Sequence, residues 1–281
     1  MQTKIMATPS LADLIRLAKE LDQADAPYVL VLGDEESVRR QAAGIRCLVS
    51  DVDDTLTLRR GWAIMREQLP PELRAADERF LNAFLEESRK APTPELIAAE
   101  EGAWVAVDVQ FMAEARWTRA DVWSLAEGMG MRPGVPAFFN RFTERCLVSF
   151  GLKDVIDRWL AVHDLKVRWV YATSIVFKGT DEASPSDRVG HADPMSVTTS
   201  STKGEHVREF LHVHGVDLSS VLAIGDDPKV DGRLWRPEHL NVLVKPPNGP
   251  IKADRLGFST MNLKLFASGI DALNDYLDAV S

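Results

Sequence analysis

The segment "RCLVSDVDDTLT" (residues 46–57) places an apolar strand directly before three carboxylates, Asp51, Asp53 and Asp54. Like charges at this spacing repel one another and lose hydration when they are buried. A bound cation, a reaction or a well-solvated turn would each account for the cluster. The remainder of the chain helps to choose between these three explanations.

The composition of the 281-residue chain is that of an ordinary globular protein, with 45% hydrophobic and 27% charged residues. A formal net charge of −9 argues against a broad surface for nucleic acid or anionic membranes. No apolar run approaches the roughly 20 residues of a membrane-spanning helix, and the N-terminal segment lacks the apolar stretch of a signal peptide. We therefore expect a cytoplasmic protein, a monomer or homodimer, that binds neither nucleic acid nor membrane. Cys47 and Cys146, each beside an apolar run, are expected to be buried free thiols.

Short apolar strands alternate with amphipathic helices along most of the chain. Continuous Val, Leu and Ile runs without alternation suit strands that are covered on both faces. The expected strands are 28–32, 45–50, 145–148, 167–172, 221–225 and 241–245, and the expected helices between and around them are 11–21, 34–43, 152–163, 203–214 and 268–279. Ser10 is a candidate N-cap of the first helix. This pattern predicts an α/β fold with a doubly wound, Rossmann-like parallel sheet and a site at the carboxyl ends of its strands.

The alternation breaks between residues 62 and 135, where the pattern is helical without a convincing strand. Thr93 and Thr118 are candidate N-caps within this region. Four of the seven tryptophans also fall here: Trp62, Trp104, Trp117 and Trp123. They either fill the core of the insertion or line a cleft over the carboxylate cluster.

We predict two domains on this basis. Residues 1–61 and 136–281 form the α/β core, with an extra N-terminal βα unit at 1–44, and residues 62–135 form an all-helical cap. The polar stretch 178–194 is rich in turn formers, so we expect a surface loop or a hairpin tip there.

Further candidate site residues follow two other expected strands or begin a helix. They are Ser149, Phe150 and Gly151 after 145–148, Lys203 at the start of the helix at 203, and Asp226, Asp227 and Asp231 after 221–225. Taken alone, each has a plain explanation, such as an N-cap, a surface lysine or a turn residue. Their joint occurrence in this order on an α/β pattern favours a functional site.

This set resembles the four motifs of the haloacid dehalogenase (HAD) superfamily of phosphohydrolases, over residues 45–250. The motifs D-x-D-x-T, Ser or Thr, Lys, and G-D-x-x-x-x-D are matched by Asp51, Asp53 and Thr55, by Ser149, by Lys203, and by Asp226 and Asp231. The helical insertion lies where C1-type caps of this superfamily sit. Together with "VSFGLKDVIDRWL" (148–160), it is most similar to the cytosolic pyrimidine 5′-nucleotidases, with phosphoserine phosphatases as a neighbouring branch.

The resemblance implies an enzyme, a HAD-like hydrolase that cleaves phosphate monoesters with Mg²⁺. Asp51 would be the nucleophile that forms an aspartyl-phosphate, Asp53 would act as general acid and then general base, and Lys203 would stabilise the phosphoryl charge. Ser149 would bind the phosphoryl group, and the neighbouring substrate-binding residues are Phe150, Gly151 and Thr55. The implied ligands of the metal are Asp51, the backbone carbonyl of Asp53, Asp226 and Asp231, with Asp231 alternatively holding the metal's waters.

Three further details of the motifs bear on the assignment of roles. The "GDD" sequence leaves open whether Asp226 or Asp227 is the metal ligand. Asp54 has no role in this scheme, so we expect it to be solvated or to cap a helix. Asp53 favours a phosphatase or a phosphomutase, because dehalogenases lack a carboxylate at this position.

A helical cap over the site implies a small, soluble phosphorylated substrate, because a closed cap excludes macromolecules. Aromatic cap residues that could stack a base fit a nucleoside monophosphate. We expect Glu100, Glu101 and Arg132 to be solvated helix residues; the alternative is that Glu100 or Glu101 reads the base edge and Arg132 reads a carboxylate or second phosphate. The alternatives are a phosphoserine or sugar phosphatase, a phosphomutase, or a non-catalytic phosphate-binding module. The complete motif set argues against the non-catalytic module, since binding alone gives no reason to keep Asp53.

Overall fold

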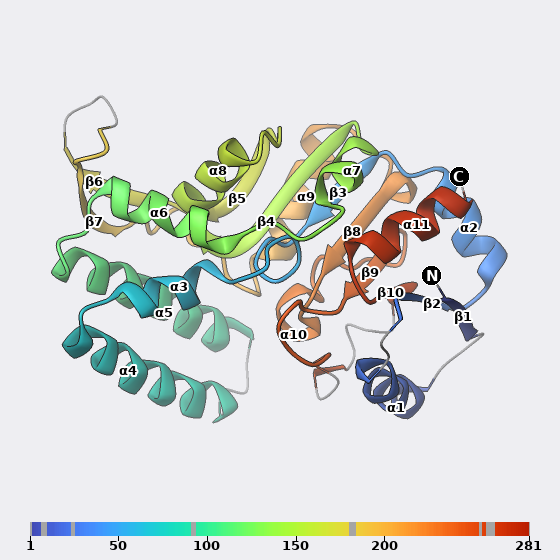
Figure 1. The fold of residues 1–281 in the computed structure, drawn as a ribbon, viewed down its shortest axis with the longest axis horizontal. Coiled ribbons are helices and arrows are strands. Elements are labelled where there is room, and N and C mark those ends of the chain that lie inside the picture. Colours follow the sequence, from blue (N-terminus) through green and yellow to red (C-terminus); the bar gives the residue numbers. More distant parts are fainter. Residues whose placement is uncertain are drawn as a thin grey trace.

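The computed structural model describes residues 2–6, 10–23, 26–90, 94–179, 184–252, 255–256 and 262–280. Within them, eight strands form one sheet in the order β1-β2-β10-β9-β8-β3-β4-β5 (Figure 1). Their bounds are β1 Gln2–Met6, β2 Tyr28–Leu32, β3 Cys47–Ser50, β4 Glu144–Leu152, β5 Trp169–Thr173, β8 Val221–Gly225, β9 Leu240–Val244 and β10 Leu265–Ala267. Neighbouring strands are parallel except where β10 runs antiparallel to β2. The predicted α/β architecture with a parallel sheet is confirmed.

Helices cover both faces of this sheet, and the strand sequences show why. In β3, Leu48 joins one buried apolar cluster, while Cys47 and Val49 join another on the opposite face. Both faces are therefore apolar, as the unalternating runs predicted. The helices of the sheet domain are α1 Leu11–Asp22, α2 Glu35–Ala43, α7 Val135–Asn140, α8 Lys153–Val162, α9 Lys203–Val213, α10 Pro228–Asp231 and α11 Ile270–Val280.

The N-terminal unit extends the sheet at its edge. β1 pairs with β2 in parallel register, and α1 follows it. The hydroxyl of Ser10 accepts a hydrogen bond from the N–H of Asp13 at 3.2 Å, which confirms Ser10 as the cap of α1. None of the described helices combines the length and apolar character that crossing a bilayer requires. Cys47 and Cys146 are buried free thiols, as predicted.

Four helices occupy the predicted insertion between β3 and β4. They are α3 Gly61–Gln68, α4 Pro71–Lys90, α5 Pro94–Glu114 and α6 Arg119–Met129, and α4 and α5 lie side by side (Figure 1). Thr118 caps α6, and its hydroxyl accepts from the N–H of Asp121 at 3.3 Å, as predicted. Thr93 lies outside the described residues. The domain boundaries at 62 and 135 stay a prediction.

A β-hairpin from a later part of the chain packs against this helical insertion. Strand β6 (Ile175–Lys178) pairs antiparallel with β7 (Arg188–Ala192), and residues 180–183 between them lie outside the described residues. The N–H of Val189 donates to the carbonyl of Trp117 at 2.9 Å, and β7 packs against α5. The stretch 178–194, expected to be a surface loop or a hairpin tip, thus contains the last residue of β6 and the whole of β7. Through β7 this hairpin contacts the helical insertion.

Candidate active site

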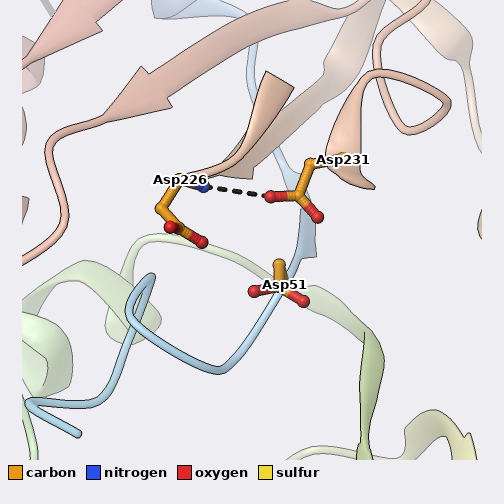
Figure 2. Close-up of side chains that lie close together, drawn as sticks. All are labelled: Asp51, Asp226 and Asp231. Carbon is orange, nitrogen blue, oxygen red and sulfur yellow. Dashed lines mark hydrogen bonds between the residues drawn. The ribbon is translucent and has the colours of Figure 1, made fainter. Parts of the chain in front are cut away.

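Three aspartates meet at the carboxyl ends of β3 and β8, which are neighbours in the sheet. Asp51 follows β3 directly, and its N–H donates to the carbonyl of Ile224 at 3.0 Å, so the two strands end together. Asp226 follows β8, and Asp231 ends the short helix α10. One carboxylate oxygen of each lies within 4.8 Å of the others, and Figure 2 shows the three side chains turned toward one space.

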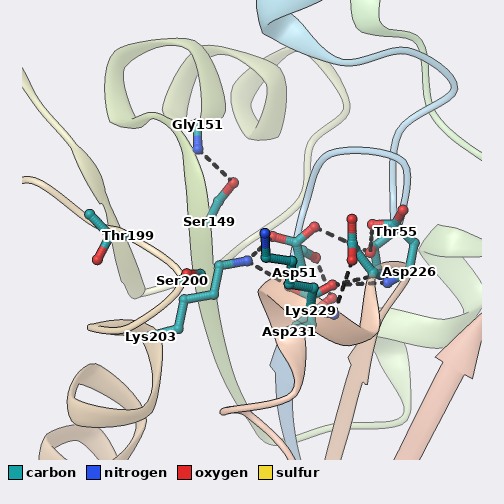
Figure 3. A network of polar contacts seen from close by, with 12 residues as sticks. Asp51, Thr55, Ser149, Gly151, Thr199, Ser200, Lys203, Asp226, Lys229 and Asp231 are labelled. Atoms are coloured by element: carbon teal, nitrogen blue, oxygen red, sulfur yellow. Dashed lines mark hydrogen bonds and ion pairs between the residues drawn. The ribbon is translucent and has the colours of Figure 1, made fainter. Parts of the chain in front are cut away.

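Lys203, the first residue of α9, reaches into this cluster. Its Nζ lies 2.6 Å from Oδ1 of Asp51 and 2.7 Å from Oδ1 of Asp231, and the side chain is fully buried (Figure 3). Burial alone would lower the pKa of Lys203, but the carboxylates of Asp231 and Asp51 outweigh it and raise that pKa above its ordinary value. Lys203 is therefore a fixed positive charge beside the predicted nucleophile.

Asp231 holds the turn of the fourth motif as well as Lys203. Its Oδ2 accepts from the backbone N–H groups of Asp226 and Asp227 at 3.1 and 3.0 Å. A Cβ at Gly225 would lie 2.4 Å from that oxygen, so only glycine leaves room for the carboxylate. Both oxygens of Asp231 are thus engaged by protein donors, which suits an anchoring role.

The structure separates the two residues that the sequence left ambiguous. Asp226 faces Asp51, and burial followed by repulsion from Asp231 raises its pKa to about 7 although Lys252 opposes the shift. Asp227 instead caps α10, accepting from the N–H of Lys229 at 3.0 Å, and pairs with Lys252 and Arg255. Of the two, Asp226 lies with Asp51 and Asp231 in the group of carboxylates that could hold a cation.

Asp53 lies beside the cluster but its carboxylate turns toward α3. Its Oδ1 accepts from the N–H of Gly61 at 3.0 Å. Burial, reinforced by the nearby charge of Asp54, raises the pKa of Asp53 to about 6. A carboxyl with this pKa exchanges a proton near neutral pH, as a general acid and base must.

The second motif approaches Asp53 from β4. The hydroxyl of Ser149 accepts from the N–H of Gly151 at 3.0 Å. A Cβ at Gly151 would lie 3.2 Å from Ser149 Oγ and 3.3 Å from Asp53 Oδ2, which is tight. Gly151 therefore lets the two motifs approach each other closely.

Thr55, predicted among the substrate-binding residues, lies between two carboxylates. Its Oγ1 is 3.3 Å from Oδ2 of Asp51 and 3.4 Å from Oδ1 of Asp226. The side chain is fully buried and does not line the cavity that opens over these carboxylates. Its contacts position the carboxylates.

Two sequence expectations are wrong. Asp54, expected to be solvated or to cap a helix, is buried at a left-handed φ of 60° and paired with Arg60. Arg132, expected to be solvated on a helix or alternatively to read a substrate anion, is buried behind the first motif, and its Nη1 donates to the carbonyl of Asp54 at 2.8 Å. Asp54 is bound by Arg60, and Arg132 is bound to the backbone of Asp54. Both residues therefore fix the loop that carries Asp51 and Asp53.

A cavity of about 380 Å³ opens over the cluster, and the sheet domain and the helical insertion both line it. Its walls include Ser149 and Phe150 from β4, and Trp62 and Trp104 from α3 and α5. The centroid of the Trp104 ring lies 5.0 Å from the ring centroid of Phe150 and 5.6 Å from that of Trp62. These two tryptophans therefore line a cleft.

The other tryptophans of the insertion lie elsewhere. Trp117 is buried in the core, and Trp123 lies against the guanidinium of Arg158. The carboxylate of Glu101 also lines the cavity, but it accepts from the N–H and hydroxyl of Ser200, each at 2.8 Å. Glu101 thus joins α5 to the loop before Lys203, and its alternative role as a reader of the base edge stays untested.

Sequence reasoning missed the basic residues around the cavity. They are Arg60, Arg66, Lys229, Lys252 and Arg255. Lys252 Nζ lies 2.7 Å from Asp226 Oδ2 and 2.9 Å from Asp227 Oδ2. Arg60 follows the first motif closely enough to have been considered, whereas Lys252 and Arg255 arrive on a loop after β9 that no motif marks.

Comparison with known proteins gives structural matches only. No protein-family model matches the sequence, and a search of curated proteins finds no match. The crystal structure of cytosolic 5′-nucleotidase IIIB bound to cytidine is similar with a TM-score of 0.55 and 14% identity, over 88% of this chain and 90% of that chain. A substrate-bound phosphoserine phosphatase has a TM-score of 0.51 and 12% identity, over 72% of this chain and 88% of that chain.

A HAD family hydrolase from Salmonella enterica subsp. enterica serovar Typhi is also similar, with a TM-score of 0.51 and 12% identity. The match covers 70% of this chain and 62% of that hydrolase, which is less than two thirds of its length. At such identities the similarity establishes the fold. The chain therefore shares the α/β fold of these hydrolase and phosphatase structures, as the motifs predicted.

Proposed function

We propose that this protein is a Mg²⁺-dependent phosphomonoesterase that acts on a small phosphorylated metabolite. The observation that carries the proposal is the position of Lys203 Nζ, 2.6 Å from Asp51, in a buried cluster at the carboxyl ends of parallel strands. A non-catalytic phosphate-binding module would not need Asp53, whose pKa is raised to about 6 beside that cluster. A cytoplasmic location and a monomeric or homodimeric state remain part of the proposal.

The residues present suit a magnesium ion. Asp51 and Asp226 offer carboxylate oxygens to one space, and a hard cation prefers oxygen ligands of this kind. The backbone carbonyl of Asp53 is the third proposed protein ligand. Asp231 would position Lys203 and the turn at 225–227 through its hydrogen bonds to them. When bound, the ion offsets the charge of the carboxylates and the phosphate.

The chain's own residues account for both chemical steps. An oxygen of Asp51 attacks phosphorus, the bond from phosphorus to the ester oxygen breaks, and the leaving alcohol takes the proton of the Asp53 carboxyl. Asp53 then removes a proton from water, the water oxygen attacks phosphorus, and phosphate leaves while the Asp51 carboxylate is restored. Ser149 and Lys203 hold phosphoryl oxygens throughout and stabilise the charge that develops on them.

The cavity supports a nucleoside monophosphate as the substrate class. Its volume of about 380 Å³ and its aromatic wall at Trp62, Trp104 and Phe150 suit a flat, mostly apolar group attached to a phosphate. The similarity to a nucleotidase structure bound to cytidine points the same way. A phosphoserine or sugar phosphatase is the second candidate, since a substrate-bound phosphoserine phosphatase shares the fold.

The test is a phosphate-release assay over nucleoside monophosphates, phosphoserine and sugar phosphates, with Mg²⁺ or with EDTA. We expect Mg²⁺-dependent release, strongest for a nucleoside monophosphate, and none from Asp53→Asn, which keeps the shape of the side chain but loses its acid function. Transfer of phosphate between substrates without net release would instead indicate a phosphomutase. No release from any substrate would contradict the proposal.

A further inference from the structure

One guanidinium on the cavity wall is held in place by two buried carboxyl groups. Arg66 of α3 donates from Nε to Oδ2 of Asp77 on α4 at 2.5 Å, and from Nη2 to Oδ2 of Asp108 on α5 at 3.2 Å. Its third nitrogen, Nη1, has no hydrogen-bond partner among the described residues, and Arg66 lines the cavity above the carboxylate cluster. The Cζ atom of Arg66 lies 5.5 Å from the centroid of the Trp104 ring.

The charges of this group do not balance if both aspartates are ionised. Asp77 and Asp108 are both fully buried, and the Oδ1 atom of each meets no donor among the described residues. Two buried carboxylates against one guanidinium would leave a net negative charge in a medium that solvates it poorly. Burial raises the pKa of Asp108 to about 9. At neutral pH Asp108 therefore keeps its proton.

Bracing three helices does not require this arrangement. Well-packed apolar residues of similar volume brace helices as well as or better than a buried ion pair. The hydrogen bonds to Asp77 and Asp108 fix the orientation of the Arg66 guanidinium before any ligand arrives. They leave Nη1 to bind a ligand in the cavity. A fixed fork loses little conformational entropy on binding a carboxylate or a phosphate.

We propose that Arg66 is a specificity-determining residue: it binds an anionic group, a carboxylate or a second phosphate, at the end of the substrate remote from the phosphoryl group. Asp77 is the residue that positions it. This inference rests on the proposed phosphatase function, which places the phosphoryl end of the ligand at Asp51, and it favours a substrate with a second anionic group over a simple nucleoside monophosphate. Its test measures binding and needs no turnover. Lys229 also lines the cavity, and its side chain has no hydrogen-bond partner among the described residues, so it supplies the matched control.

The experiment compares ligand pairs that differ by one anionic group, titrated calorimetrically into an Asp51→Asn background with Mg²⁺ so that no turnover occurs. One pair is 3-phosphoglycerate and glycerol 3-phosphate, and the other, of longer reach, is fructose 1,6-bisphosphate and fructose 6-phosphate. We expect tighter binding of the more anionic member of at least one pair, by roughly tenfold to a hundredfold, as for charge-assisted hydrogen bonds.

Four further variants in that background assign the preference to Arg66. Arg66→Met combined with Asp77→Asn removes the ion pair and leaves the buried site neutral, so it should fold and lose the preference. Asp77→Asn alone should weaken the preference, whereas Asp108→Asn, which imitates the protonated carboxyl, should retain it. Lys229→Met should also retain it.

The proposal is overturned if the Asp51→Asn protein binds both members of each pair equally or binds none of the four ligands. It is also overturned if the double variant, shown to be folded by its circular dichroism, keeps the preference, or if Lys229→Met alone abolishes it. A protein that releases no phosphate yet shows the Arg66-dependent preference would contradict the proposed function and leave this inference standing.

Discussion

The side chain of Lys203 is enclosed between Asp51 and Asp231 and exposes no surface. Removing its charge would leave two buried carboxylates without their shared cationic partner, and breaking such a pair costs about 3–5 kcal/mol. We therefore expect Lys203→Met to lose activity and also to unfold at a lower urea concentration than the wild type. An unchanged urea midpoint would show that these charges are solvated or otherwise compensated.

Asp51→Asn separates chemistry from folding at the same position. Asparagine keeps the size of the side chain, and its Oδ1 can still accept from Lys203 while its Nδ2 donates to the Thr55 hydroxyl, but its amide does not attack phosphorus. We expect phosphate release to disappear while the circular dichroism spectrum is retained. Release at the wild-type rate from this variant would exclude the covalent route.

Motif spacing was sufficient to find the residues that meet at the site. Asp51, Ser149 and Asp226 were predictable because parallel neighbouring strands end at the same edge of a sheet, and Lys203 because it begins the next helix. The partners of Asp54 and Asp227 were not predictable in this way. They depend on how Arg60 and the loop carrying Lys252 fold back over the site, which no local pattern encodes.

At the scale of helices, the buried carboxyl of Asp108 on α5 makes the stability of the insertion depend on pH. The folded protein keeps this proton up to a pKa of about 9, whereas the unfolded chain releases it near the ordinary value of about 3.9. Between these values the folded state binds more protons, so this group lowers the free energy of unfolding as pH rises.

Asp108→Asn removes that dependence, so we expect the variant to become more stable relative to the wild type as pH increases. The measurement is urea unfolding of both proteins at several pH values between about 5 and 8. A stability difference that does not change with pH would show that Asp108 is ionised in the folded protein.

The contact between Glu101 of α5 and Ser200 connects the helical insertion to the loop that precedes Lys203. A hydrogen bond to a charged group contributes about 1.5–3 kcal/mol, so Glu101→Gln and Ser200→Ala should each loosen this junction. We expect faster amide exchange in α5 and in residues 196–203, and no further increase when the two changes are combined. Additive increases in exchange would mean that the two residues act independently.

Among the elements, long apolar runs were predicted more reliably than short or polar strands. The strand at 28–32 has the predicted bounds, because all five of its residues are buried. β1 and β7 were missed because their sequences, "QTKIM" and "RVGHA", are short and largely polar, and their pairing partners rather than their own composition define them.

At the scale of the whole molecule, the helical insertion was predictable as a unit but its partner was not. Its sequence is helical throughout, yet it is joined to the sheet domain by the β6–β7 hairpin, which comes from a separate part of the chain. The cavity therefore forms where the carboxyl edge of the sheet meets the insertion, and a motif scan of either part alone does not describe it.

The central claim is that Asp51 is phosphorylated during turnover, and trapping that group tests it most directly. The protein would be mixed with its best substrate and Mg²⁺, quenched, reduced with borohydride, which converts an aspartyl-phosphate to homoserine, and digested for peptide mass spectrometry. We expect homoserine at position 51 only when substrate is present. Turnover without modification at Asp51, or with modification at another carboxylate, would contradict the account.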